Sequence, residues 1–235
     1  MDLIPGEKEN ILVVDDDKDI LGFLKVYIES AGYRFYSADN TKDALHIVES
    51  HSVDLIILDV LLPQTSGFDI CLELRKRTRI PIIFLSCKNE EMDIIMGLSS
   101  GADDYITKPF LPGELMARIR SNLRRTIDYD GGGSGHIVSY RDIEANLFTR
   151  EASVGKIPVR LLPKEFDILV LFLRHPNRVF SKDEICLYIW KESVYFGDIN
   201  TLSVHISNLR KKLSVGNDTR IMTVKGIGYK LTGGA

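Results

Sequence analysis

The first 125 residues alternate short apolar segments with stretches of helical periodicity. The apolar segments lie at residues 11–14, 33–36, 55–58, 80–85 and 105–106. Between the first two segments, apolar side chains recur at helical spacing: Ile20, Phe23, Leu24, Tyr27 and Ile28. Strands that alternate with helices favour parallel βαβ units. The pattern therefore predicts an α/β fold with a doubly wound, five-stranded parallel sheet.

Charged and hydroxyl side chains directly follow the predicted strands. Asp15 and Asp16 come after the first strand, Asp59 after the third, Ser86 after the fourth and Lys108 after the fifth. In a doubly wound sheet, ligands bind outside the carboxyl ends of the strands. We therefore expect these side chains to meet in one crevice.

This set of side chains is suited to phosphoryl chemistry at a divalent metal ion. Mg²⁺ prefers oxygen ligands, so Asp15, Asp16 and Asp59 are candidate magnesium ligands. The Lys108 ammonium and the Ser86 hydroxyl can neutralise the oxygens of a phosphoryl group. Asp59 stands alone at its strand end and is the best candidate for a nucleophile that forms an acyl phosphate.

Each of these residues also has an ordinary structural interpretation when it is taken singly. Ser86 could cap a helix, Asp59 could begin a turn and Lys108 could be solvated, but their joint placement favours a shared site. Asp17 is expected to cap the helix that follows it. A rival hypothesis is a phosphatase with Asp15 as nucleophile and Asp17 as acid/base, which leaves Asp59 without a role.

The composition is that of an ordinary soluble globular protein, with 44% apolar and 27% charged residues. No stretch reaches the roughly 18 consecutive apolar residues of a membrane span. The N-terminal residues show no basic-then-apolar signal pattern. We therefore expect a cytoplasmic protein with no membrane partner. Its cysteines, Cys71, Cys87 and Cys186, lie far apart and are interpreted as buried free thiols.

Residues 126–136, with the sequence TIDYDGGGSGH, are typical of a flexible linker, whether natural or engineered. About eleven residues of such coil span roughly 18 Å. The segment predicts separately folded domains at residues 1–125 and 137–235. The first is acidic overall, whereas residues 200–230 are locally basic, which indicates different partners for the two domains.

The second domain has the patterns of a small α+β fold. Short alternating segments from Ile137 predict an antiparallel sheet, and three helical patterns follow it. Pro163 is suited to the first turn of the first helix. Ser181 and Glu184 form a capping box before the second helix, and the third is expected to begin near Asp198.

The third helical pattern separates an apolar stripe from a polar face. Leu202, Ile206, Leu209 and Leu213 form the stripe, and Asn200, Val204, Ser207, Asn208 and Lys211 lie opposite, with Arg210 and Lys212 on the flanks. Such a face is most often simply solvated. However, asparagine pairs with adenine edges in the major groove of DNA, and an apolar group fits the thymine methyl. In the hairpin that follows, Lys225 could reach a minor groove or a phosphate.

Four segments of the first domain closely resemble the receiver domain of two-component response regulators: ILVVDDD, DLIILDVLLPQTSGFD, PIIFLS and GADDYITKPF. The resemblance implies a flavodoxin-like receiver in which Asp15, Asp16, Asp59 and the main-chain carbonyl of Leu61 bind Mg²⁺. It further implies that Asp59 accepts phosphate from a sensor histidine kinase and that Lys108 contacts the phosphoryl group. Ser86 would complete this catalytic set.

The same resemblance implies a conformational switch and a cis peptide. Ser86 and Tyr105 match the family's switch pair, in which the hydroxyl moves toward the phosphate and the ring turns into the vacated space. The Lys108–Pro109 bond would be cis.

The segment PFLPGELMARIRSNLRR resembles the last receiver helix of the OmpR/PhoB subfamily, whose receivers pair through this face. Asp103, Asp104, Glu114 and Arg118 match residues that form ion pairs between subunits. The competing interpretation is a Glu114–Arg118 pair at i,i+4 spacing within one helix. Ile94 stands where many relatives have a lysine, which removes one expected partner and adds apolar surface.

The segments HISNLRKKL and TVKGIGYKL resemble the winged-helix DNA-binding domain of the same subfamily. By this resemblance Val204, Asn208 and Arg210 would meet bases, and Ser207 lies on the same face. The following would lie at the DNA backbone or on the wing: His205, Lys211, Thr223, Lys225 and Tyr229. Residues 191–199 would face RNA polymerase.

These interpretations together predict a transcription regulator rather than an enzyme. Phosphate on Asp59 would favour a homodimer, and the two tethered winged helices would bind tandem half-sites in promoter DNA. A regulator that is active without phosphate is the third option, which the complete set of acidic residues and Lys108 disfavours.

Overall fold

The computed structural model of the chain describes residues 8–63, 65–88, 90–123, 137–190, 196–214 and 220–232, with the backbone alone for residues 91 and 196–199. The chain divides into two compact units, residues 1–125 and 126–235. The predicted linker, residues 126–136, lies outside the described residues, so its flexibility stays a prediction. Among the helices that are described, none has the length and apolar character to cross a bilayer.

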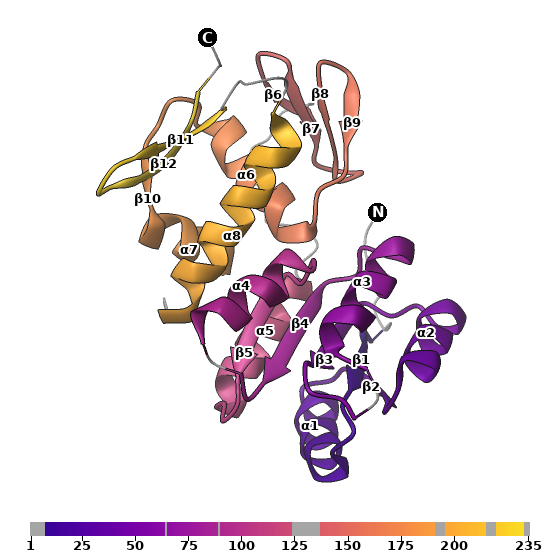
Figure 1. Cartoon of the computed structure of the whole chain (residues 1–235). Coiled ribbons are helices and arrows are strands. Elements are labelled where there is room, and N and C mark those ends of the chain that lie inside the picture. The colour runs from indigo at the N-terminus through magenta and orange to yellow at the C-terminus, as the bar shows by residue number, and fades with distance from the viewer. Residues whose placement is uncertain are drawn as a thin grey trace. The chain divides into compact units, whose positions relative to one another are not determined.

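The first unit alternates strands and helices along the chain, as predicted (Figure 1). Its described elements are β1 (Asn10–Val14), α1 (Lys18–Ser30), β2 (Arg34–Ala38), α2 (Thr41–Ser50), β3 (Leu55–Asp59), α3 (Gly67–Arg77), β4 (Ile82–Ser86), α4 (Glu91–Ser99), β5 (Asp104–Thr107) and α5 (Pro112–Leu123). The strands form one parallel sheet in the order β2-β1-β3-β4-β5. The α/β prediction with a five-stranded, flavodoxin-like sheet is thus confirmed.

Both faces of this sheet are covered by helices, which explains why the strands are apolar without alternation. Ile11 and Val13 of β1 pack in one core cluster with residues of α1 and α5. Leu12 and Val14 point to the opposite face and are just as completely buried. Strands buried on both faces are expected in a doubly wound sheet.

Two local features bring the chain back toward the carboxyl end of the sheet. Asp17 caps α1, since its Oδ1 accepts hydrogen bonds from the backbone N–H groups of Asp19 (2.8 Å) and Ile20 (3.2 Å). At the start of α3, a Cβ on Gly67 would lie 2.0 Å from the carbonyl oxygen of Asp59. Glycine is therefore required where α3 approaches the end of β3.

The second unit contains two antiparallel sheets and three described helices. The first sheet is β6 (Ile137–Tyr140), β7 (Ile143–Asn146), β8 (Glu151–Val154) and β9 (Ile157–Val159), in that order. The helices are α6 (Pro163–Arg174), α7 (Lys182–Trp190) and α8 (Phe196–Leu213). The second sheet joins β10 (Phe180–Ser181), β12 (Gly228–Leu231) and β11 (Ile221–Val224), in the order β10-β12-β11. The α+β prediction is confirmed, although the short β10 was not foreseen.

The core of this unit lies between α6, α7, α8 and the sheets. The predicted apolar stripe of α8, from Leu202 to Leu213, is buried in this cluster. The predicted capping box is present: the Glu184 N–H donates to Ser181 Oγ (3.1 Å) and the Ser181 N–H donates to Glu184 Oε2 (2.7 Å). Helix α7 therefore begins where the sequence indicates.

The prediction for the cysteines is partly wrong. Cys71 and Cys186 are buried and outside any disulfide, but Cys87 is exposed. Cys87 follows the last residue of β4 and lies in the connection to α4, where the chain has left the sheet.

Candidate functional site

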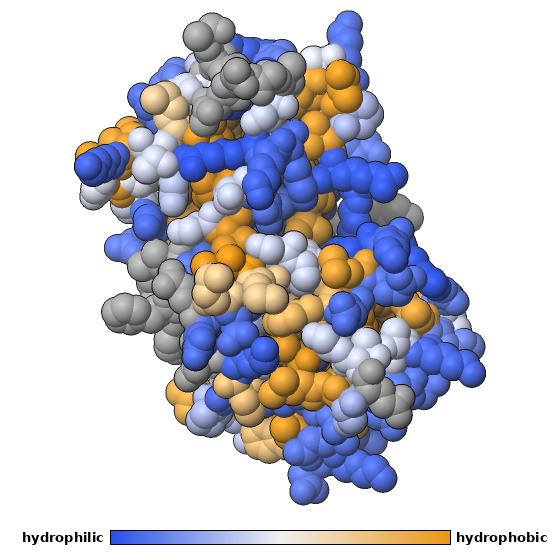
Figure 2. All heavy atoms as spheres, in the orientation of Figure 1, coloured by the Kyte–Doolittle hydropathy of each residue, from blue (hydrophilic) through white to orange (hydrophobic). Residues whose placement is uncertain are grey.

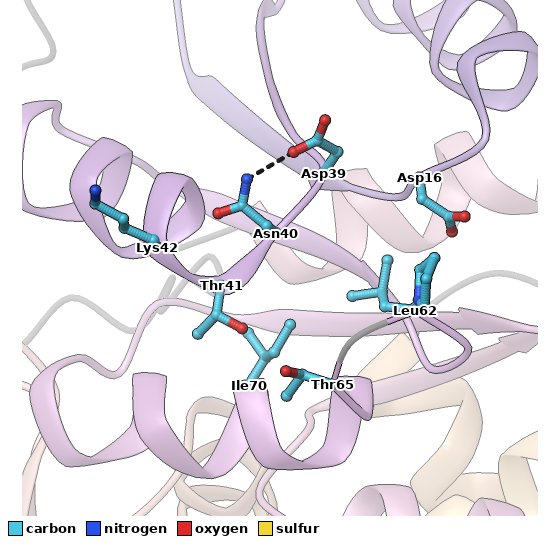
Figure 3. Close-up of a pocket in the computed structure, with 9 residues that line it drawn as sticks. Asp16, Asp39, Asn40, Thr41, Lys42, Leu62, Thr65 and Ile70 are labelled. Carbon is cyan, nitrogen blue, oxygen red and sulfur yellow. Dashed lines mark hydrogen bonds between the residues drawn. The ribbon is translucent and has the colours of Figure 1, made fainter.

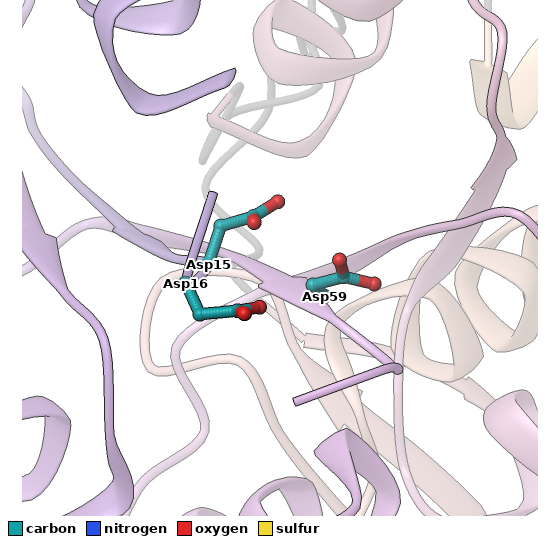
Figure 4. A group of neighbouring side chains, drawn as sticks. All are labelled: Asp15, Asp16 and Asp59. Carbon is teal, nitrogen blue, oxygen red and sulfur yellow. The ribbon is translucent and has the colours of Figure 1, made fainter. Parts of the chain in front are cut away.

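Three carboxylates meet at the carboxyl end of the parallel sheet. Asp15 and Asp16 follow β1, and Asp59 is the last residue of β3, the adjacent strand. One oxygen atom from each of the three side chains lies within 4.8 Å of those of the others. In Figure 4 the three carboxylates extend into the same space. This point lies between β1 and β3, where the strand order reverses, and doubly wound folds bind ligands there.

The Lys108 ammonium, brought in by the end of β5, lies between two of these carboxylates. Lys108 Nζ donates to Asp15 Oδ2 at 2.9 Å and to Asp59 Oδ2 at 2.8 Å. Burial alone would lower the pKa of Lys108, but the hydrogen bonds to Asp59 and Asp15 outweigh it and raise the pKa. Burial raises the pKa of Asp15, although its bonds to Lys108 and to the Asp17 N–H oppose that shift.

Backbone groups fix the orientation of the same side chains. Asp59 Oδ1 accepts a hydrogen bond from the Leu61 N–H (3.1 Å), and Asp15 Oδ1 accepts one from the Asp17 N–H (2.9 Å). The Lys108 N–H donates to the carbonyl of Ser86 (2.7 Å), which joins the ends of β4 and β5. The Lys108–Pro109 peptide bond is cis, as the sequence resemblance implied.

The charge and chemistry of this pocket fit a divalent cation. Three carboxylates and one ammonium carry a formal charge of −2, and like charges this close together are costly unless a cation joins them. The ligands on offer are oxygen atoms, which Mg²⁺ prefers. Asp15 and Asp59 are buried and Asp16 is exposed, so an ion held here would also be reached by water.

An open pocket with a volume of about 580 Å³ adjoins Asp16 (Figure 3). In Figure 3 the Asp16 side chain lies at one end of the pocket, and the start of α2, with Asn40 hydrogen-bonded to Asp39, borders another part. The loop after β3 and the start of α3 contribute Leu62, Thr65 and Ile70. The exposed carboxylate of the acidic group is therefore accessible from solvent.

Ser86 and Tyr105 lie on adjacent strands, but the ring of Tyr105 is already turned inward. Tyr105 is buried and its hydroxyl donates to the carbonyl of Lys88 at 2.9 Å. Ser86 is also buried, and its Oγ accepts from the Lys88 N–H at 3.2 Å. Burial raises the pKa of Tyr105, while a hydrogen bond to Ser86 works against that shift. The predicted switch pair therefore meets at the backbone of Lys88.

The residues predicted for ion pairs between subunits have partners within their own chain. Arg118 Nη1 donates to Asp104 Oδ1 at 2.7 Å, and Arg118 Nη2 lies 3.3 Å from Glu114 Oε1. Asp103 Oδ2 accepts from Arg75 Nη2 at 2.8 Å. The Glu114–Arg118 contact at i,i+4 spacing, which was the competing interpretation, is thus present. The sequence did not reveal Arg75, because its partner is distant in the chain.

Ile94 of α4 was expected to add apolar surface, and the structure differs from that expectation. Ile94 is buried, so it adds no exposed apolar surface to this helix. The exposed large hydrophobic residues of α4 are Met92 and Met96, at i,i+4 spacing. Figure 2 shows hydrophobic side chains on the surface over α4.

The predicted DNA-facing residues of the second unit fall into two groups. Those that are exposed or half-buried are Ser207, Asn208, Arg210, Lys211, Thr223 and Lys225. The others, Val204, His205 and Tyr229, are at most 7% exposed, and their contact with DNA stays a prediction. In Figure 2 the end of the β11–β12 hairpin, which carries Lys225, shows hydrophilic and hydrophobic side chains together.

The burial of His205 and Tyr229 has a physical cause. Both α6 and α7 pack against α8, so the buried arc of α8 is wider than its leucine stripe. The His205 ring lies 6.2 Å from the Trp190 ring of α7, and Tyr229 belongs to the core cluster.

The fold and the pocket define a receiver-type signalling module, joined to an α+β unit whose recognition-type helix lies beside a β-hairpin. A family model described as "Response regulator receiver domain" matches residues 11–120. A second, described as "Transcriptional regulatory protein, C terminal", matches residues 156–231.

Relatives match along almost the whole chain. The chain is 36% identical over 227 residues to Regulatory protein VanR of Enterococcus faecium, covering 95% of this chain and 98% of that protein. It is 39% identical to Transcriptional regulatory protein YvrH of Bacillus subtilis (strain 168), covering 95% of each. It is 36% identical to DNA-binding response regulator MtrA of Mycobacterium tuberculosis (strain ATCC 25618 / H37Rv), covering 95% and 96%.

Solved structures agree with these relatives. A variant of RitR has a TM-score of 0.74 with 25% identity, covering 95% of this chain and 98% of that one. The response regulator DrrB, a Thermotoga maritima OmpR/PhoB homolog, has a TM-score of 0.52 with 26% identity, covering 97% and 100%. The chain therefore belongs to the two-component response regulators of the OmpR/PhoB type, which are DNA-binding transcription regulators.

Proposed function

We propose that this response regulator is controlled by transfer of a phosphoryl group from a sensor histidine kinase to Asp59. The observation that carries the proposal is the position of Lys108 Nζ, which bridges Asp59 and Asp15 in a pocket with a formal charge of −2. The pocket thus offers a nucleophile, a cation for the phosphoryl oxygens and ligands for a metal ion.

The transfer itself requires little beyond positioning and charge neutralisation. A carboxylate oxygen of Asp59 attacks the phosphorus of a phosphohistidine, the P–N bond breaks, and the imidazole leaves with the bonding electron pair. Lys108 then pairs with a phosphoryl oxygen, and the Ser86 hydroxyl donates to another. Mg²⁺, when bound by Asp15, Asp16, Asp59 and the carbonyl of Leu61, would neutralise the remaining phosphoryl charge.

We further propose that phosphorylation acts through Ser86 and Tyr105. The Ser86 hydroxyl would turn from the Lys88 N–H toward the phosphoryl group. The Tyr105 ring, already held by the Lys88 carbonyl, would then be fixed in its inward position. A local change of charge would in this way become a change in packing between β5 and α4.

The proposed dimer uses the face of α4, β5 and α5. Asp103, Asp104, Glu114 and Arg118 remain its expected polar residues, but their intrachain partners mean that these pairs would have to be shared or exchanged on association. Exposed Met92 and Met96 would add flexible apolar contact.

Dimerisation would present two winged helices to tandem half-sites in double-stranded promoter DNA. Ser207 and Asn208 would face bases, and Lys211, Thr223 and Lys225 would contact the DNA backbone or minor groove. Residues 126–136 would tether the two domains and raise the effective concentration of the second winged helix. Residues 191–199 would face RNA polymerase. Their side chains are not among those that the structure describes, so this contact stays a prediction. Because promoter DNA is the partner, we expect the protein to act in the cytoplasm.

The test compares Asp59→Asn with Asp54→Asn in the full chain. Asp59 is the last residue of β3, and Asp54 directly precedes the first. At that opposite end of the strand, Asp54 Oδ2 accepts a hydrogen bond from the Asn10 N–H. After incubation with Mg²⁺ and acetyl phosphate, we expect wild type and Asp54→Asn to gain one phosphoryl mass and Asp59→Asn to gain none. We also expect phosphorylation to raise the dimer fraction and the affinity for selected DNA.

Labelling of Asp59→Asn at the wild-type rate would refute the assigned acceptor. The rival phosphatase would require Asp15 and Asp17 and be indifferent to Asp59. Its acid/base residue is occupied here, since the Asp17 carboxylate caps α1. Wild-type DNA affinity that stays unchanged on phosphorylation would instead favour a regulator that is active without phosphate.

A further inference from the structure

The Arg210 side chain leaves α8 and contacts both strands of the β11–β12 hairpin. Its Nε donates to the carbonyl of Ile221 at 2.8 Å, and its Nη2 donates to Thr223 Oγ1 at 2.6 Å. Its guanidinium carbon also lies 5.5 Å from the centre of the Tyr229 ring. The guanidinium thus makes three contacts with the hairpin, and two of its donor nitrogens are used there.

These contacts reach the strand of the hairpin that lies at the edge of its sheet. In the order β10-β12-β11, β12 is paired on both sides and β11 on one. The β12 side is fixed by close packing, because a Cβ on Gly228 would lie 1.9 Å from the carbonyl oxygen of Phe180 in β10. Among the described residues β11 pairs only with β12, and Arg210 binds Ile221 and Thr223 of this edge strand.

The exposed end of this hairpin carries the cation expected to meet DNA. Thr223 pairs directly with Tyr229 across the hairpin, and Lys225 lies in the turn between the two strands. The turn is closed by the Ile227 N–H, which donates to the carbonyl of Val224 at 2.9 Å. Arg210 therefore contacts the hairpin two residues before the exposed Lys225.

We propose that Arg210 is a positioning residue that holds the hairpin at a fixed place relative to α8, so that Lys225 reaches DNA while α8 lies in the major groove. The proposal rests on the proposed DNA binding of this unit. The arrangement suits arginine, because its planar fork of donors can bind a carbonyl and a hydroxyl while its face stacks on an aromatic ring. Base reading on α8 is then left to smaller polar side chains such as Ser207 and Asn208.

The proposal predicts that the contribution of Lys225 to DNA binding depends on Arg210. In the full chain we would measure the affinity of wild type, Lys225→Ala, Arg210→Met and the double variant for a duplex that wild type selects from a random pool. Lys225→Ala should weaken binding about tenfold in wild type and less than about twofold in the Arg210→Met background. Lys211→Ala is the matched control, and its effect should be the same in both backgrounds.

The salt dependence of the DNA affinity tests the proposal independently. Loss of one cation that contacts phosphate should reduce the slope of log affinity against log salt by about one. The double variant should therefore have the slope of Arg210→Met alone, whereas two independent contacts would reduce it by about two.

A measurement without DNA separates positioning from direct contact. Amide hydrogen exchange across residues 221–231 should become faster in Arg210→Met and in Arg210→Lys, which keeps the charge but lacks the fork. Thr223→Val, which removes only the hydroxyl acceptor, should show a smaller increase, and Lys211→Ala none. Circular dichroism would confirm that each variant is folded. If Arg210→Met does not fold, the comparison uses Arg210→Lys and Thr223→Val instead.

Three outcomes would overturn the assignment. Additive losses for Arg210→Met and Lys225→Ala would make Arg210 an independent DNA contact. Full retention of affinity and exchange protection in Arg210→Lys would show that charge alone matters. If neither Lys225→Ala nor Lys211→Ala weakens binding, the proposed DNA-binding face is itself wrong. That result differs from additive losses, which would contradict only the positioning role of Arg210.

Discussion

The two units use their charged side chains in opposite ways. In the first unit, Lys108 is shared between Asp15 and Asp59, and the pocket retains an excess of negative charge with the neighbouring Asp16. In the second unit, cations of α8 are already engaged within the protein: Arg210 with the hairpin, and Lys212 with Glu165. The first arrangement fits a cation bound from outside, whereas in the second the cations already have partners within the protein.

The comparison teaches that a charged residue on a functional face does not have to contact the ligand. A charge with no local compensation points to a ligand, because burying it otherwise costs free energy. A charge with a complete set of intramolecular partners points to a structural or positioning role. Four substitutions would break or sharpen this distinction, beginning with the one of largest expected effect.

Lys108→Met would test most severely whether the acidic pocket, with its excess of negative charge, is the site of phosphorylation. Removal of this donor should slow labelling by acetyl phosphate about 10²–10³-fold, by analogy with the loss of one group that stabilises developing negative charge. The rate of phosphoryl mass gain measures the effect. Lys88→Met is the control, because Lys88 pairs with Asp93 at 3.1 Å outside the pocket and should keep most of the rate. Equal rates for wild type and Lys108→Met would contradict the assigned pocket.

Arg118→Met would test whether the pair with Asp104 belongs to one chain. Asp104 is fully buried, and a buried carboxylate left without its cation should lower the free energy of unfolding by about 3 kcal/mol. Thermal or urea unfolding of the unphosphorylated chain measures this loss. Glu114→Gln, at the more exposed end of the same network, should cost less than about 1 kcal/mol. An unchanged unfolding midpoint with a weaker dimer would instead assign Arg118 to contacts between subunits.

Lys212→Met would test whether the ion pair between Lys212 and Glu165 stabilises the second unit. Lys212 Nζ lies 2.6 Å from Glu165 Oε2, which also accepts from the Leu162 N–H at 2.7 Å. The loss should destabilise this unit by about 1–3 kcal/mol, because Glu165 is buried. Urea unfolding measures it, with the exposed neighbour Lys211→Met expected to change stability by less than about 0.5 kcal/mol. If the two variants were equally stable, Lys212 would be an ordinary surface lysine.

Asp17→Ala should have the smallest effect and separates the cap from the acidic pocket. Two N–H groups of α1 lose their acceptor, which should cost about 1 kcal/mol of stability, while labelling of Asp59 proceeds near the wild-type rate. Asp19→Ala, which removes a first-turn carboxylate but leaves the cap, should cost about half as much. A loss of labelling in Asp17→Ala would place Asp17 in the reacting set.

The acidic pocket could be predicted from the sequence because its members are tied to strand ends. A parallel sheet brings the carboxyl ends of its strands to one edge, so Asp15, Asp59, Ser86 and Lys108 had to lie near one another once the strands were recognised. The face of α8 could be predicted only in part. Helical periodicity gives the direction in which Val204 and His205 leave the helix, but not what packs over them.

The sequence by itself determined the class of each domain, the strand ends that carry the reactive groups, and the caps at Asp17 and Ser181, since all of these depend on neighbours along the chain. The tertiary structure alone decided that Arg118 pairs with Asp104, that Asp103 pairs with Arg75, and that Arg210 contacts the hairpin. Those contacts join residues that are distant in sequence. Their formation depends on how elements pack, and periodicity carries no information about that.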